Sequence, residues 1–184
     1  MLLELGPSLP PIKAVLGSLP PGREGVRATL KIMARQAREG SKTLAVRLVA
    51  LQLVEQLAQR DWLAEIRALH EFVRDRIRYV KDIRGVETLQ DPERTLQLKQ
   101  GDCDDKTTLI SALLTSIGHP TRLHAVGFGP RGAFSHVYAE TRTWVTDRLN
   151  GERRQKWIAL ETTEPWAMGR APNAVSHLII HVTR

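Results

Sequence analysis

The stretch GDCDDKTTLISALLTSIG, residues 101–118, decides the fold because it has the pattern of one helix with a defined start. Asp102 is a good N-cap, and Asp105 stands at the third helical position, where the helix dipole favours an acid. Five apolar residues follow at helical spacing: Leu109, Ile110, Leu113, Leu114 and Ile117. Gly118 then stops the helix. The pattern predicts a strongly apolar helix whose first turn carries Cys103, the chain's single cysteine.

Cys103 has two interpretations. A lone cysteine cannot form an intrachain disulfide, so it is either a small buried hydrophobe, which composition alone favours, or a reactive thiol. At the start of a helix, backbone N–H groups and the positive dipole end lower a thiol pKa. The neighbouring acids Asp102, Asp104 and Asp105 act in the opposite direction. A nucleophilic Cys103 therefore needs a histidine partner to hold an ion pair.

His136 is the best candidate for that partner because it begins an alternating, strand-like run, SHVYAE at residues 135–140. A strand packed against the helix start can bring the imidazole within hydrogen-bond reach of the thiol, with roughly 3–4.5 Å between the sulfur and a ring nitrogen. The other histidines are expected to be structural or solvated: His70, His119, His124, His177 and His181. The last two could share a face, but they lack a second ligand pair, and no metal site is predicted.

A catalytic base works best when a third group fixes its tautomer, and two acids are available for this role. Glu161, at the end of the next predicted strand, is favoured to face the second ring nitrogen of His136. Glu140 shares the face of His136 but stands four residues away, roughly 13 Å by strand rise. Either acid could instead be an ordinary surface carboxylate.

Helices are predicted before this region and strands after it. Two helices are expected within residues 23–59 and a third over 62–78 behind an Asp61 cap, with Tyr79 and Val80 more extended. Residues 81–100 are expected to be mostly loop. Four strand-like runs follow, at residues 122–127, 136–145, 156–162 and 176–182. Helices first and strands second predict an α+β domain with an antiparallel sheet.

The chain's 184 residues suit one domain with an extension. Residues 1–22 have the composition of a Pro/Gly-rich arm, 23–60 of a helical extension, and 61–184 of the main domain. The extension is too small for a core of its own, so its apolar faces must pack on the main domain, on another copy or on a partner. We expect the arm to reach outward toward a neighbour.

The net charge of +7 is compatible with a polyanion partner, but its densest part, within residues 23–42, follows helical spacing and is best explained as a solvated helix face. Aromatic residues make up only 5% of the chain and do not interleave with this stripe, so nucleic-acid binding is disfavoured. No apolar run reaches the length of a membrane span, and the first residues lack a signal-peptide pattern. A cytoplasmic location is expected.

Several segments in order resemble the transglutaminase-like superfamily of cysteine enzymes, over roughly residues 62–170. They are residues 61–79, Thr95-Leu96, GDCDDK at 101–106, LLTSIGHPTR at 113–122, SHVY at 135–138 and WIALETT at 157–163. The family's pattern is a cysteine after Gly-Asp at a helix start, a histidine on a strand, and an acid on the next strand after a tryptophan. Cys103, His136 and Glu161 match it. The family usually has aspartate where this chain has Glu161.

The resemblance implies a papain-like triad that transfers acyl groups through a thioester, without a cofactor. Within the family, bacterial and phage members look more like hydrolases than calcium-dependent crosslinkers, and no calcium-loop pattern is present, so a peptidase or amidase acting on a peptide or cell-wall amide is favoured. Tyr79 resembles an aromatic position near the site in the family. Gln97 and Gln100 are the other candidates for an oxyanion donor, beside the Cys103 N–H.

Two alternatives remain open. The chain is also similar to stand-alone proteins of phages and prophages with an Arg-rich helical lead like residues 22–53, which implies a virion or assembly protein that keeps the fold as a scaffold. Its assembly partners would then bind the N-terminal region, in the infected cell or in the virion. A protein-crosslinking transglutaminase is the other alternative.

Overall fold

The computed structural model describes residues 20–81, 88–147 and 149–183. The expected arm of residues 1–22 therefore lies almost entirely outside the described residues. The helices are α1 (Gly22–Gly40), α2 (Leu44–Val54), α3 (Trp62–Arg76), α4 (Pro92–Leu98) and α5 (Cys103–Ser116). The strands are β1 (Arg78–Tyr79), β2 (Gln100–Gly101), β3 (Thr121–Phe128), β4 (Ala133–Thr146), β5 (Arg153–Leu160) and β6 (Ser176–His181).

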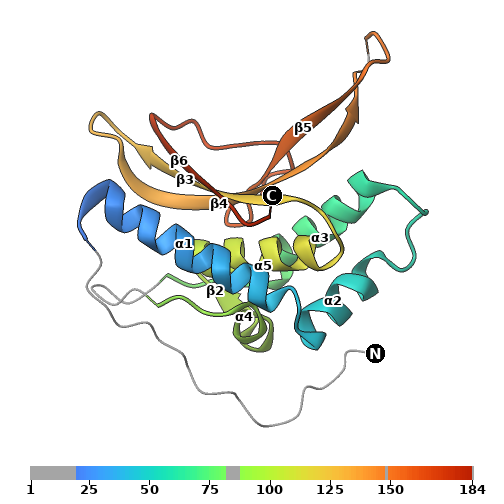
Figure 1. The fold of residues 1–184 in the computed structure, drawn as a ribbon, viewed down its shortest axis with the longest axis horizontal. Helices are drawn as coiled ribbons and strands as arrows, with labels where there is room; N and C mark the ends of the chain where they lie inside the picture. The colour runs from blue at the N-terminus through green and yellow to red at the C-terminus, as the bar shows by residue number, and fades with distance from the viewer. Residues whose placement is uncertain (1–19, 82–87, 148, 184) are drawn as a thin grey trace.

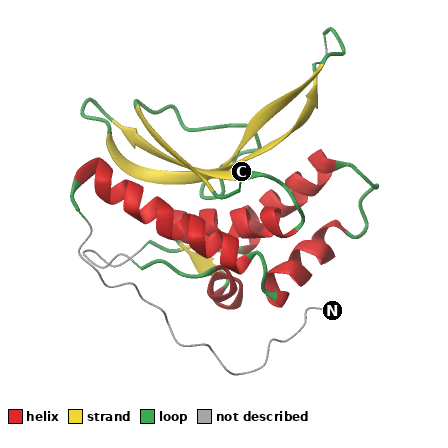
Figure 2. Ribbon diagram, in the orientation of Figure 1, coloured by secondary structure: helices red, strands yellow, loops and turns green. Residues whose placement is uncertain are grey.

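The fold has two layers, with the helices gathered on one face of an antiparallel sheet (Figures 1 and 2). The sheet has four strands in the order β5-β4-β3-β6, and every neighbouring pair is antiparallel. Helix α5 is central, since it packs on β3 and β4 and contacts the four other helices. The predicted α+β class with an antiparallel sheet is confirmed.

Helix α5 begins as its sequence predicts. The Asp102 carboxylate accepts hydrogen bonds from the N–H groups of Asp104 and Asp105, and the Asp105 carboxylate in turn accepts one from the Asp102 N–H at 3.3 Å, which completes a capping box. Every residue from 105 to 114 is buried. A helix that is buried over this length lies in the centre of the fold, and its capped end fixes where Cys103 lies.

Residues 81–100 differ from the prediction, because α4 occupies 92–98. Asp91 caps this helix by accepting from the Arg94 N–H, and Pro92 takes the first helical position, where its missing N–H costs nothing. The sequence pattern predicted mostly loop for this segment, but Asp91-Pro92 starts a helix. The residue after α4, Lys99, has φ of 52°, and the chain then enters β2, which pairs with β1 in parallel. Residues 82–87 lie outside the described part.

The N-terminal helices share the main core. Helix α1 packs on α5 and on the sheet, and α2 packs on α5 and α3. Leu30, Met33 and Ala37 of α1 belong to the same buried cluster as Leu109 and Leu113 of α5. The apolar face of α1 is therefore covered by the chain's own central helix. None of the helices in the described ranges is long and apolar enough to cross a membrane.

Candidate active site

Cys103 is the first residue of α5 and is partly buried, with its Sγ 3.5 Å from Asp104 Oδ1. Burial is the main cause that raises the pKa of this thiol, and the charges of Asp104 and Asp102 raise it further. From the sequence, the helix dipole was expected to favour a thiolate and the neighbouring acids to oppose it. With burial added, the resting side chain is a neutral thiol.

Strand β4 is attached to the first turns of α5, which brings His136 to the cysteine end of the helix. Thr107, one turn after Cys103, donates its hydroxyl to the Val137 carbonyl at 3.1 Å. Val137 follows His136 directly on β4. Among the described residues, no hydrogen bond joins Cys103 Sγ to the His136 ring, and the sulfur-to-nitrogen distance of roughly 3–4.5 Å expected from the sequence stays a prediction.

The predicted contact between His136 and Glu161 is present. His136 Nε2 lies 2.6 Å from Glu161 Oε2, and the Glu161 side chain is almost completely buried. Burial would raise the pKa of this carboxyl, but the hydrogen bonds of His136 and Thr163 outweigh burial and hold the pKa below its usual value. Glu161 is therefore a carboxylate at neutral pH. Because Glu161 contacts Nε2, the other ring nitrogen of His136, Nδ1, stays outside this contact.

Glu161 is fixed at two further points. Its Oε1 accepts from both the N–H and the hydroxyl of Thr163, each at 2.7 Å. Its main-chain carbonyl accepts from Nε2 of His70 on α3 at 2.6 Å. His70 is fully buried, and burial is the largest cause that lowers its pKa, so it is a neutral donor. Its Nδ1 has no partner among the described residues.

Lys106 is a buried cation close to this carboxylate. Its Nζ donates to the carbonyls of Ile77 and Arg74, at 2.7 and 3.3 Å, and so binds the end of α3 to α5. Burial lowers the pKa of Lys106 to about 8, and the negative charge of Glu161 opposes this shift. The sequence patterns did not identify Lys106 and Thr163 as site residues, although both lie within the segments GDCDDK and WIALETT, and they gave no role to His70 beyond a structural one.

Glu140, the alternative acid, contacts residues of β3 and not His136. Its carboxylate pairs with Arg122 on β3 and lies 3.4 Å from His124 Nδ1. His124 also contacts the Tyr138 hydroxyl at 2.8 Å and His177 at 3.0 Å. These side chains form a polar network on β3, β4 and β6, which explains the positions of His124 and His177, two of the other histidines considered as the base.

Of the three oxyanion candidates, the structure brings two to the start of α5. Tyr79 pairs with Gly101 across β1 and β2 and is 47% exposed. Gln100 lies three residues before Cys103, and its Oε1 accepts from Arg78 at 2.7 Å. Gln97 lies on α4 with a buried Oε1 that has no partner among the described residues.

Asp102, Cys103 and Asp104 place one ligand atom each within 4.8 Å of one another, a spacing that could hold a metal ion. The Asp102 carboxylate, however, already accepts two N–H groups at the helix start. The cluster is thus explained by the cap.

Comparisons with known proteins agree with this fold. A family model described as Transglutaminase-like superfamily matches residues 51–162. A solved structure of a candidate protease from Parabacteroides distasonis superposes with a TM-score of 0.51 at 15% identity, covering 79% of this chain and 34% of that one. A candidate cysteine protease from Cytophaga hutchinsonii gives a TM-score of 0.51 at 14% identity, covering 84% and 56%. The chain thus spans about a third and about half of these two proteins. No curated protein sequence matches it significantly.

Proposed function

The chain belongs to the transglutaminase-like superfamily, and on that premise we propose that it is a cysteine peptidase or amidase with Cys103 as nucleophile, His136 as base and Glu161 as orienting acid. The observation that carries the proposal is the 2.6 Å contact between His136 Nε2 and Glu161 Oε2, beside a helix that begins at Cys103. At the coarser level, family and fold support a thiol enzyme. Peptide and cell-wall amides are the favoured substrates.

In the proposed reaction, His136 Nδ1 removes the Cys103 proton as the sulfur attacks the amide carbonyl carbon. The Glu161 carboxylate stabilises the imidazolium that forms. His136 then gives its proton to the leaving nitrogen, the C–N bond breaks, and a thioester remains on Cys103. Water attacks the thioester, passes a proton to His136, and releases the acid and the thiol. The Cys103 N–H, with Tyr79 or Gln100, is the proposed oxyanion donor.

The raised thiol pKa adds a requirement to this mechanism. Because burial and Asp104 favour the neutral thiol of Cys103, its proton must pass to His136 when substrate arrives. Exclusion of water by the substrate strengthens the thiolate–imidazolium pair. Proton transfer is then coupled to substrate binding, and the free enzyme carries little reactive thiolate.

The test is an acid-quenched digest of an unfolded protein mixture analysed by mass spectrometry, with methylamine present in half the samples. We expect new N-termini and an acyl mass on Cys103, both lost in Cys103→Ser and reduced at least about a hundredfold in His136→Gln. Methylamide products in place of new acids would identify a crosslinking enzyme. Undiminished cleavage by Cys103→Ser would overturn the triad, and absence of both cleavage and acyl-enzyme would favour the scaffold role.

A further inference from the structure

Arginine and tryptophan side chains alternate on one face of the β4–β5 hairpin, which projects beyond the helical layer (Figure 1). Arg142 of β4 stands opposite Trp157 of β5, and Trp144 stands opposite Gln155. Side chains two residues apart on a strand point to the same side, so these four share a face. Arg153, two residues before Gln155, extends the same row. We name Arg122, Arg142, Trp144, Arg153 and Trp157 the Arg/Trp face.

The tryptophan rings hold the guanidinium groups in place. The Arg122 and Arg142 groups lie 4.2 and 5.6 Å from the centre of the Trp157 ring. Arg153 lies 5.6 Å from the centre of the Trp144 ring. A guanidinium stacked on an aromatic ring keeps its N–H groups free at its edge, in the fork geometry that suits carboxylates. The face therefore presents oriented cations.

Two of these cations are not neutralised. Arg122 is paired with Glu140, whereas Arg142 and Arg153 take part in none of the ion pairs of the described residues. Arg142 also lines two adjoining hollows, of about 470 and 240 Å³. A hollow of this size can receive several side chains of a ligand.

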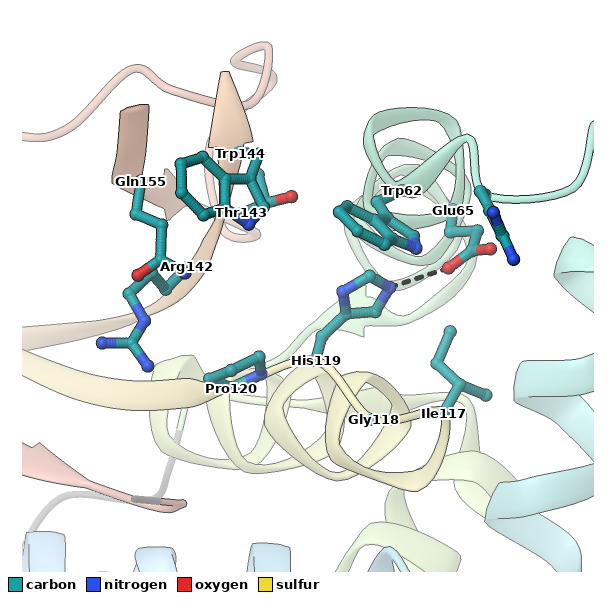
Figure 3. A pocket seen from close by; sticks show the side chains of 11 residues that line it. Trp62, Glu65, Ile117, Gly118, His119, Pro120, Arg142, Thr143, Trp144 and Gln155 are labelled. Carbon is teal, nitrogen blue, oxygen red and sulfur yellow. Dashed lines mark hydrogen bonds and ion pairs between the residues drawn. The ribbon is translucent and has the colours of Figure 1, made fainter. Parts of the chain in front are cut away.

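Trp62, Glu65 and His119 form the far wall of the larger hollow (Figure 3), which Arg60 also lines. Trp62 of α3 is 40% exposed there, across the opening from Arg142 and Trp144. Glu65, the one acid among the described lining residues, is bonded by His119 Nε2 at 2.8 Å. The hollow thus combines apolar surface with unopposed positive charge, which favours an anionic ligand that also has apolar parts.

The edge of the sheet indicates what kind of anion fits. In the described sheet β5 is an end strand, paired only with β4, and its residues 153–156 are exposed. An exposed strand edge offers N–H and C=O groups to another extended peptide backbone. Single-stranded nucleic acid would instead need open aromatic faces for base stacking, and here guanidiniums lie over the rings.

We propose that the Arg/Trp face binds an extended acidic peptide that pairs with the β5 edge and directs carboxylates to Arg142 and Arg153. In the strand register Arg153 stands opposite Thr146, four residues from Arg142, which is roughly 13 Å along the strand. Carboxylates four residues apart in the bound peptide have the same spacing. The site needs no chemistry of Cys103 and is independent of the proposed hydrolysis.

The test is fluorescence anisotropy with the full-length Cys103→Ser protein and a labelled peptide of five Val-Glu repeats, at low and physiological salt. The Glu peptide should bind, more weakly as salt rises. The same peptide with Lys for Glu should not bind, and N-methylation of alternate residues should abolish binding by blocking the strand edge. Affinity should fall at least about tenfold in Arg142→Ala/Arg153→Ala.

The matched control, Arg35→Ala/Arg47→Ala, removes two exposed arginines from α1 and α2 and should bind like the parent. An equal loss of peptide affinity in both double variants would show that the net charge of the protein alone drives binding, and would overturn the proposal. Tighter binding of a ten-residue oligothymidylate would assign the face to nucleic acid. Absence of binding to all probes would mean that the edge charges only prevent strand-to-strand aggregation.

Discussion

Replacing Lys106 by Met tests whether a buried cation is held beside the candidate triad. The Lys106 side chain is 2% exposed, and its Nζ donates to the Ile77 and Arg74 carbonyls at the end of α3. Met has a similar shape without charge or donor. It relieves the cost of burying an ammonium but leaves buried carbonyls unpaired, at about 1–3 kcal/mol. The two effects oppose each other, so the pH dependence is the informative quantity.

Burial lowers the pKa of Lys106 from 10.5 to about 8 in the folded protein. Between these values the unfolded chain binds more protons than the folded chain, so this group makes the free energy of unfolding rise with pH. Below both values the folded ammonium is destabilised by about 3 kcal/mol, at 1.36 kcal/mol per pKa unit. Roughly 1 kcal/mol of this should be recovered between pH 7 and pH 9.

The assay is urea denaturation of the wild type and Lys106→Met at both pH values. The wild-type midpoint should rise relative to that of the variant by about 0.5 M from pH 7 to pH 9. Comparing the two midpoint shifts cancels the contributions of other groups that titrate between pH 7 and pH 9. Lys31→Met removes an exposed ammonium from α1 and should follow the wild type at both pH values. If the wild-type midpoint does not rise relative to that of Lys106→Met between pH 7 and pH 9, burial does not lower the pKa of Lys106 in the folded protein.

Three further outcomes are expected. Glu161→Gln should lower kcat for peptide hydrolysis at least about a hundredfold, because an amide cannot stabilise the imidazolium. Glu140→Gln, on the same sheet face, should keep kcat within about threefold. Equal losses of kcat in the two variants would contradict the assigned roles. Asp104→Asn removes the largest charge effect on the thiol, so the pKa of Cys103 should fall and its alkylation rate at pH 8 rise; a slower or equal rate would contradict this. Gly127→Ala would make its Cβ overlap the main-chain oxygen of Gly132 in the β3–β4 turn and should lower the free energy of unfolding, measured in urea, by more than about 2 kcal/mol. Near-wild-type stability would exclude that contact.

Local signals explain what the sequence could predict. The Asp61 and Asp102 caps and the apolar spacing behind them place α3 and α5, because a cap acts within its own first turn. Strict alternation places β4 and with it His136. The helix that starts at Asp91-Pro92 was not predicted because the same dipeptide starts both turns and helices, and only the packing of α4 on α5 decides between them.

The remaining parts of the site depend on contacts between distant residues. His70 lies 91 residues before Glu161, whose carbonyl it binds, and nothing in the apolar stripe of α3 indicates that contact. The raised pKa of Cys103 likewise follows first from its burial in the folded chain, which the sequence does not show. The Arg/Trp face arises from pairing across a hairpin, and a search for basic spacing along one helix could not find it.

The longer side chain at the acid position follows from the sheet register. Leu160, the last paired residue of β5, stands opposite Ala139, so continuing the register places Glu161 opposite Tyr138, diagonal to His136. Diagonal neighbours on adjacent strands are about 7–8 Å apart, farther than directly opposed residues. Glutamate covers that distance with one more methylene than aspartate, and Thr163 holds its second oxygen so that the added torsion is not free. His136 and the acid therefore meet at 2.6 Å although they are not opposite each other, and the departure from the family's aspartate is compatible with an intact pair.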